Sequence, residues 1–327
     1  FWDLGSWRFP RGGGAVENLR QGVAFWQLLD TAAVDATVFK VPANFPPVPT
    51  DSRTLSGMGT PDIQGTYGQY TYVTDDPLAE RDLSGGVLRA VYLADGRCET
   101  VIAGPANIYR EGAPAATVPL TVAVDRESRA ALVEVAGRRM LLREGEWSEW
   151  LTLEFGLVPL LKSVRGVARV YLMETEPYLR LYVTPVQIDP AAPEMPISTP
   201  DDYARELAEA LGPFYTQGLP SDTKALEEGV FTDSDYLSQS DLVFAERKQQ
   251  LAHELTRFAA RPDGFLYVYY PSPDQDCHLW WRGTDPRSPL PAACAEEHHG
   301  RIPEIYQALD AVLDGVLDTV DDETLVM

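Results

Sequence analysis

A short apolar run that ends in a polar segment constrains the fold of this chain most. Residues Phe265–Tyr270 are all aromatic or aliphatic, and Pro271 follows them. Such a run predicts a strand buried on both faces, as in a parallel sheet covered by helices. Asp274 and His278 come next, in what we interpret as a loop. Because open α/β sheets bind ligands just beyond the carboxyl ends of their strands, the sequence predicts a ligand-binding loop here.

The residue types in this segment favour a metal ion. A carboxylate oxygen and an imidazole nitrogen suit a borderline metal such as zinc. We therefore predict that Asp274 and His278 bind one ion, which would polarise a phosphoryl oxygen or activate a water molecule. The alternative is a loop in which Asp274 caps a turn and His278 packs on a neighbouring tryptophan. Asp276 is a competing ligand, and the paired His298 and His299 are a second metal-binding candidate.

Composition narrows the classes of partner. The chain has 327 residues, of which 45% are hydrophobic and 23% charged, so a globular fold of one or two domains is expected. The formal charge of −22 argues against binding to a nucleic acid duplex and to anionic membrane surfaces. No apolar run reaches the ~20 residues of a membrane-spanning helix. The three cysteines do not make a disulfide framework.

The chain divides into three regions by pattern. Residues 1–84 and 188–327 predict two parts of one α/β core, with helices over 15–30, 199–211, 239–259 and 302–318 and a strand over 36–41. Residues 85–187 show short alternating runs separated by turn residues, which predicts an inserted, mainly antiparallel β subdomain. Both ends of the sequence look cut, and residues 323–327 resemble the start of a strand.

Several segments together resemble a known family. They resemble bacterial members of the alkaline phosphatase superfamily, in the branch of type I phosphodiesterase/nucleotide pyrophosphatase-like phosphohydrolases. The resemblance spans most of the chain and is least specific in the β subdomain. The segments are Phe25–Leu29, Val38–Pro47, Leu55–Asp62, Phe214–Pro220, Asp222–Leu226, Asp274–Trp281, Asp285–Pro286 and Ile305–Tyr306.

The resemblance implies an alkaline-phosphatase-like α/β/α sandwich with two divalent metal ions, usually zinc. One ion is held by the Asp and His of a D-x-x-x-H segment, which Asp274 and His278 match, and by a further downstream His. The second is held by an early Asp, a Thr or Ser nucleophile and a Ser-Asp-His-Gly-type segment, none of which this sequence contains. The nucleophile is therefore expected upstream of residue 1, and the chain alone is expected to be inactive.

The function implied is hydrolysis of a small-molecule phosphate ester or nucleotide, with the 85–187 unit recognising the leaving group. Two alternatives remain at this point. One is a phosphomutase-like enzyme of the same superfamily, because the D-x-x-x-H segment occurs there too. The other is a non-catalytic binding or scaffold protein that has kept the fold.

Overall fold

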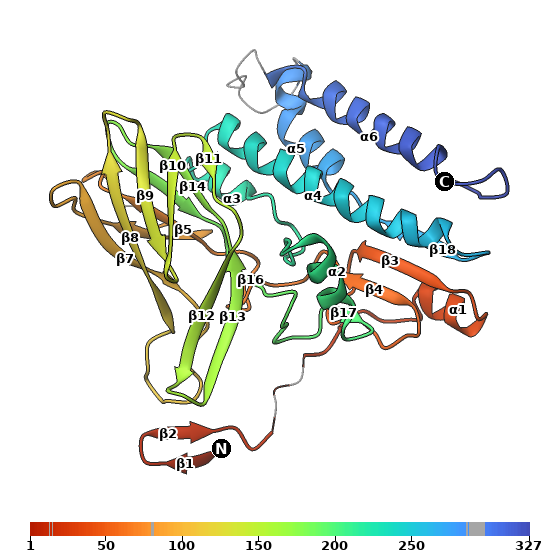
Figure 1. Ribbon diagram of the computed structural model, residues 1–327, viewed down its shortest axis with the longest axis horizontal. Helices are drawn as coiled ribbons and strands as arrows, with labels where there is room; N and C mark the ends of the chain where they lie inside the picture. The colour runs from red at the N-terminus through yellow and green to blue at the C-terminus, as the bar shows by residue number, and fades with distance from the viewer. Residues whose placement is uncertain (13, 15, 80–81, 286, 288–297) are drawn as a thin grey trace.

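The computed structural model describes residues 1–12, 14, 16–79, 82–285, 287 and 298–327. Within them the fold is mixed α/β, with a β-rich part on the left of Figure 1 and a small sheet with most of the helices on the right. The helices of the described residues are α1 (Phe25–Thr31), α2 (Tyr203–Leu211), α3 (Thr223–Glu227), α4 (Asp233–Ala259), α5 (Ser272–Thr284) and α6 (Arg301–Leu317).

The strands of the described residues form five sheets. A hairpin joins β1 (Trp2–Leu4) and β2 (Trp7–Phe9), and the small sheet has the order β17 (Ser198–Thr199), β4 (Arg53–Ser56), β3 (Ala36–Val41) and β18 (Phe265–Val268). A second four-stranded sheet has the order β10 (Arg138–Arg143), β9 (Ala130–Val135), β8 (Thr117–Asp125) and β7 (Arg97–Ala103). The five-stranded sheet has the order β11 (Glu146–Trp147), β14 (Val170–Glu174), β15 (Arg180–Val183), β5 (Tyr70–Thr74) and β6 (Gly86–Ala90). The three-stranded sheet has the order β12 (Leu151–Val158), β13 (Lys162–Ala168) and β16 (Gln187–Ile188).

The small sheet carries helices on both faces. Every residue of β3 is buried, and β3 runs parallel to both β4 and β18. Its β-branched residues predicted the strand. Trp26 of α1 packs with Val38 on one face. Tyr203 of α2 packs with Phe39 on the other. The α/β layering is therefore confirmed, while the specific alkaline-phosphatase-like sandwich remains a prediction.

The β-rich part is inserted between two neighbouring strands of the small sheet, β4 and β17. The chain leaves after β4 and returns at β17, which pairs antiparallel with β4. Strand β12 shows the expected alternation of buried and exposed positions, because every second side chain faces the β core. Strand β5 also pairs in this part, antiparallel to β15, so its five-stranded sheet begins before residue 85.

Tyrosine–carboxylate hydrogen bonds join the five-stranded sheet to the helices. The hydroxyl of Tyr171 donates to Asp235 at 2.9 Å, and that of Tyr182 donates to Asp222 at 2.7 Å. Asp222 also caps α3 by accepting from the backbone N–H of Ala225 at 2.9 Å. These bonds cross a buried aromatic cluster, so they fix how the helices lie against the sheet.

The position of Asp222 makes stability depend on pH. Burial raises its pKa to about 6 from an ordinary 3.8, although the Tyr182 hydroxyl and the Ala225 N–H oppose the change. The folded state thus holds the proton more tightly than the unfolded chain, and stability falls as pH rises from about 4 to about 6. The amide side chain of the Asp222→Asn variant does not titrate. The free energy of unfolding of Asp222→Asn should therefore rise by about 2–3 kcal/mol, relative to that of the unsubstituted chain, when the pH is raised from 4 to 7. Urea unfolding at both pH values measures this difference.

Asp125→Asn provides the control for the sign of that effect. Hydrogen bonds from Ser128 lower the pKa of the exposed Asp125, so its contribution to stability is lost as pH falls. The pH dependence of the Asp125→Asn difference should therefore be opposite in direction and smaller. A pH-independent difference for Asp222→Asn would contradict the assignment of a raised pKa to that residue.

Several predicted elements differ from the structure. The strand predicted over 265–270 as buried on both faces is β18, which spans Phe265–Val268, is the end strand of the small sheet and has only half-buried residues, because among the described residues it pairs with β3 alone. The helix predicted over 239–259 begins earlier, at Asp233. The helix predicted over 15–30 is reduced to α1; described residues before it are non-helical, and Leu19 and Val23 point to solvent instead of into a helix interface. The helix predicted from residue 199 begins at Tyr203, because Thr199 pairs in β17. No strand forms over residues 323–327.

Candidate metal centre

The segment that carries Asp274 and His278 is the start of helix α5, not a loop. Pro271 occupies the N-cap, a proline follows within the first turn, and Asp274 places a carboxylate near the helix N-terminus. Proline tolerates the first turn because its missing N–H has no intrahelical partner there, and acids are favoured by the helix dipole. The loop prediction was wrong because these helix-start signals were taken for turn signals.

Helical spacing brings the two predicted ligands together. Asp274 and His278 lie one turn apart on the same exposed face of α5, with the His278 Nε2 3.6 Å from the Asp274 Oδ1. Their side chains are 68% and 78% exposed, respectively. Two ligands bound about 2.1 Å from a tetrahedral zinc ion lie about 3.4 Å apart. The donor atoms therefore fit a shared ion with little rearrangement.

The pair also lies at the carboxyl end of the parallel strand. The backbone N–H of Tyr269 donates to the carbonyl of Phe39 at 3.1 Å, which continues the pairing of β18 with β3 up to the start of α5. Burial raises the pKa of the Tyr269 hydroxyl, and the nearby negative charge of Asp274 raises it further. Asp274 thus lies beside the end of β18, at the edge of the sheet that the sequence indicates.

Asp276, the competing ligand, faces the opposite side of α5. Its carboxylate is fully buried and accepts a hydrogen bond from the Nε of Arg301 on α6 at 2.8 Å. The Nη2 of Arg301 also lies 2.9 Å from a carboxylate oxygen of Asp241 on α4. Burial raises the pKa of Asp276, although the charge of Arg301 opposes this. Arg301 therefore joins three helices, and Asp276, which it binds, is not available to a metal held by Asp274.

A second charged cluster, which the sequence analysis did not predict, joins Lys40 of β3 and Glu246 of α4 through the backbone of Tyr215. The Nζ of Lys40 is buried and donates to the backbone carbonyls of Tyr215 and Thr216 at 2.7 and 3.4 Å. Glu246 on α4 accepts from the backbone N–H of Tyr215 at 3.0 and 3.3 Å. The side chains of Lys40 and Glu246 thus hold the same stretch of backbone. The one available signal was that Lys40 is among only four lysines in the chain.

Burial perturbs the ionisation of this cluster strongly. It lowers the pKa of Lys40 well below its ordinary value, and the charge of Arg247 lowers it further. Burial raises the pKa of Glu246 to about 7, opposed by Lys40 and Arg247. Such values often mark functional sites. Because the Lys40 ammonium is engaged by two carbonyls, we assign it the role of positioning the backbone at residues 214–220.

That backbone packs tightly against the carboxyl edge of the small sheet. A Cβ on Gly57, just after β4, would lie 2.0 Å from the carbonyl oxygen of Lys40. A Cβ on Gly218 would lie 2.6 Å from the carbonyl oxygen of Gly57. Only glycine fits at these positions, since the neighbouring atoms are backbone and do not move aside. The glycines therefore serve close packing of three backbone segments.

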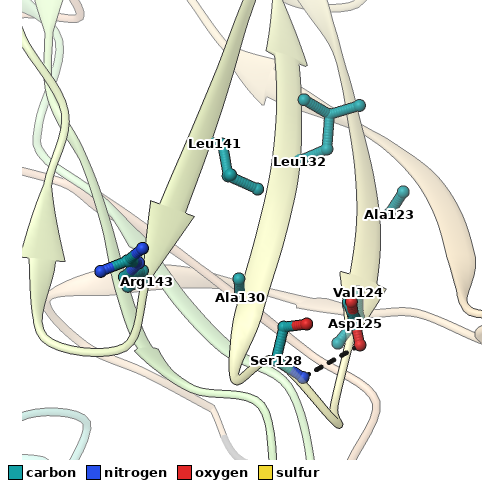
Figure 2. Close-up of a pocket in the computed structure, with 8 residues that line it drawn as sticks. All are labelled: Ala123, Val124, Asp125, Ser128, Ala130, Leu132, Leu141 and Arg143. Carbon is teal, nitrogen blue, oxygen red and sulfur yellow. Dashed lines mark hydrogen bonds between the residues drawn. The ribbon is translucent and has the colours of Figure 1, made fainter.

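The remaining candidates lie elsewhere. The Nε2 of His298 is 3.3 Å from the hydroxyl of Ser234, and the acidic residues just before it, Glu296 and Glu297, lie outside the described residues. A surface depression of about 650 Å³ lies on the outer face of β8, β9 and β10 (Figure 2). Leu132 pairs with Leu141 across two of these strands. This depression is on a different sheet from β18, the strand that precedes Asp274 and His278.

The described residues set two limits on interpretation. They contain no group of three or more His, Cys, Asp or Glu side chains placed to share a metal ion. They also contain no helix with the length and apolar composition required to cross a bilayer.

In comparisons with known proteins, no family model, curated protein or solved structure matches this chain.

Proposed function

We propose that this chain supplies a metal-ligand pair to a metal-dependent phosphate ester hydrolase of the phosphodiesterase/nucleotide pyrophosphatase type. The observation that carries the proposal is the convergence of Asp274 and His278 at the carboxyl end of parallel strand β18. Binding sites of open α/β sheets lie at this edge. The family resemblance of the surrounding segments supports the same activity.

The donor set defines what the pair does. Asp274 and His278 would hold a zinc ion, which when bound supplies a Lewis acid for a phosphoryl oxygen. Their solvent exposure leaves the outer side of the pair open to a phosphate ester. A catalytic zinc site takes three protein ligands, one more than the described residues bring together here. We therefore expect weak zinc binding and no turnover by the 327-residue chain alone.

Zinc titration of the purified chain tests the ligand assignment. We expect Zn²⁺ to perturb the imidazole NMR signal of His278 first, with a dissociation constant weaker than about 1 μM because two ligands are present instead of three or four. Asp274→Asn should weaken this binding about tenfold or more, since it removes one of the two ligands. His253→Ala, which changes a half-buried histidine of α4 that belongs to neither candidate, is the matched control and should leave the titration unchanged.

A ternary titration tests the phosphate ester. With zinc present, p-nitrophenyl phosphate should bind to the unsubstituted chain and to His253→Ala, and binding should be lost in His278→Ala. Zinc binding that is equal in the unsubstituted chain and in Asp274→Asn would refute the metal centre. Metal binding without any metal-dependent binding of the ester would favour the scaffold alternative. Measurable hydrolysis of bis(p-nitrophenyl) phosphate by the chain alone would contradict an incomplete site.

A further inference from the structure

Large apolar side chains gather at one end of the β-rich part. Three turn-containing segments meet there: the β1–β2 hairpin, the loop between β7 and β8, and the turn between β12 and β13 (Figure 1). We call this end the apolar tip. Its exposed members are Phe1, Trp2, Leu4, Ile108, Leu160 and Leu161. Exposed apolar residues scattered singly need no explanation, but a group on adjoining turns indicates a contact surface.

Specific contacts hold the three segments together. The backbone N–H of Arg8 in β2 donates to the carbonyl of Tyr109 at 2.7 Å, and the rings of Phe9 and Tyr109 lie 6.0 Å apart. The side chain of Asn107 donates to the carbonyl of Leu157, next to the β12–β13 turn, at 2.9 Å. The tip is therefore a built part of the structure, in which each segment is placed by its neighbour.

The two leucines of the β12–β13 turn are held outward at a conformational cost. Leu160 is fully exposed and has a φ of 62°, in the left-handed region that bulky residues rarely adopt. Leu161 beside it is 77% exposed. A glycine or asparagine would meet the backbone requirement more easily and would not expose an apolar side chain. The turn thus presents two leucines to the surroundings against both conformational and hydration preferences.

The charge of the tip differs from that of the rest of the chain. Residues 1–12, 105–112 and 158–162 hold four basic side chains and two acidic ones, whereas the whole chain carries −22. Two of the four basic side chains are paired: Lys162 lies 3.0 Å from Glu194, and Arg8 lies 3.0 Å from Glu111. The proposal therefore concerns the other two, Arg11 and Arg110. Arg11 lies over the ring of Trp2 at 4.6 Å, and Arg110 over that of Trp7 at 5.9 Å. Tryptophan and arginine side by side, with aliphatic residues projecting beyond them, are typical of surfaces that insert into a lipid headgroup region.

We propose that the apolar tip is a docking surface for an anionic lipid bilayer, with Leu160 and Leu161 entering the acyl boundary and Arg11 and Arg110 meeting the headgroups. Arg11 and Arg110 favour anionic headgroups, whereas the acidic remainder of the chain is repelled by them, so only the tip is expected to contact the bilayer. This surface is separate from the proposed metal centre and does not depend on it.

Vesicle sedimentation with the full chain tests the proposal. We expect binding to phosphatidylcholine vesicles that contain about 30% phosphatidylglycerol, and weaker binding to pure phosphatidylcholine. The variant Leu160→Ser/Leu161→Ser should lower the partition coefficient about tenfold or more, because two inserted leucines are lost. The matched control is Leu132→Ser/Leu141→Ser, which changes two exposed leucines on the outer sheet face and should bind like the unsubstituted chain.

A second measurement does not depend on the leucine variants. Brominated phospholipid in the vesicles should quench tryptophan fluorescence of the unsubstituted chain, and Trp2→Leu should reduce that quenching. Absence of binding to anionic vesicles would overturn the proposal, as would equal losses in the two double variants. A dimer in lipid-free solution that Leu160→Ser/Leu161→Ser dissociates would also overturn it, because a second copy would then cover the tip.

Discussion

Replacement of Arg301 by methionine is expected to lower the free energy of unfolding by about 3–5 kcal/mol, because it leaves a carboxylate buried without its cation. That carboxylate belongs to Asp276, which has no solvent exposure and receives a 2.8 Å hydrogen bond from Arg301. The same guanidinium lies 2.9 Å from Asp241, so one side chain joins α4, α5 and α6. Urea unfolding at neutral pH measures the loss.

Two further variants separate this effect from a general loss of arginine. Arg205→Met removes an exposed arginine near Asp202 and Glu209 and should change stability by less than about 0.5 kcal/mol. The double variant Asp276→Leu/Arg301→Met should recover much of the loss, because neither buried charge remains. If Arg301→Met costs no more than Arg205→Met, the buried pair does not hold the helices together.

The buried pair also explains how the candidate site is presented. On α5 the residues Asp276 and Trp280 face the neighbouring helices and are fully buried. Asp274 and His278 are spaced one turn apart on the exposed side. The sequence alone suggested two possible ligands, Asp274 and Asp276, in one loop. In a helix, residues two positions apart point in nearly opposite directions, so only one of them pairs with His278.

Elements with uniform local signals were predictable from the sequence. Strand β3 is rich in β-branched residues and β18 is a continuous apolar run, and both lie within or close to the predicted ranges. Helix α6, predicted over 302–318 from its apolar spacing, spans Arg301–Leu317. The segment before α1 has similar apolar spacing but stays extended: Asn18 donates to the carbonyls of Ala43 and Pro46 and holds it against the loop after β3. Such long-range contacts override the local helix propensity, and the spacing of apolar residues in the sequence does not reveal them.

The candidate site was predictable only in part, for a similar reason. Asp274 and His278 are close in sequence, so their spacing alone suggested a shared ligand. The Lys40 and Glu246 cluster joins residues more than two hundred positions apart through the backbone of Tyr215, and no pattern in the sequence links them. Lys40 lies in a run that reads as an ordinary buried strand, yet its φ of 59° turns the chain at a bulge in the β3–β4 pairing. Backbone irregularities of this kind are visible only in the fold.

Substitution of Gly57 by alanine is expected to destabilise the protein by about 3 kcal/mol or more, because the added Cβ overlaps backbone atoms that do not move aside. It would lie 2.0 Å from the carbonyl oxygen and 2.4 Å from the carbonyl carbon of Lys40, and 2.7 Å from the carbonyl oxygen of Val41. Relief requires β3 and the loop after β4 to separate, which would also disturb the Lys40 contacts with residues 215 and 216.

The matched control is Gly315→Ala in helix α6, where a Cβ meets no atom within 4 Å. There alanine should raise stability by about 0.5–1 kcal/mol, because it is the better helix former. The same chemical change is thus expected to act in opposite directions at the two positions, and urea unfolding of both variants resolves the difference. A Gly57→Ala protein as stable as the unsubstituted chain would mean that the carboxyl edge of the small sheet is less tightly packed than the structure shows, and the placement of the neighbouring Asp274 and His278 would then need revision.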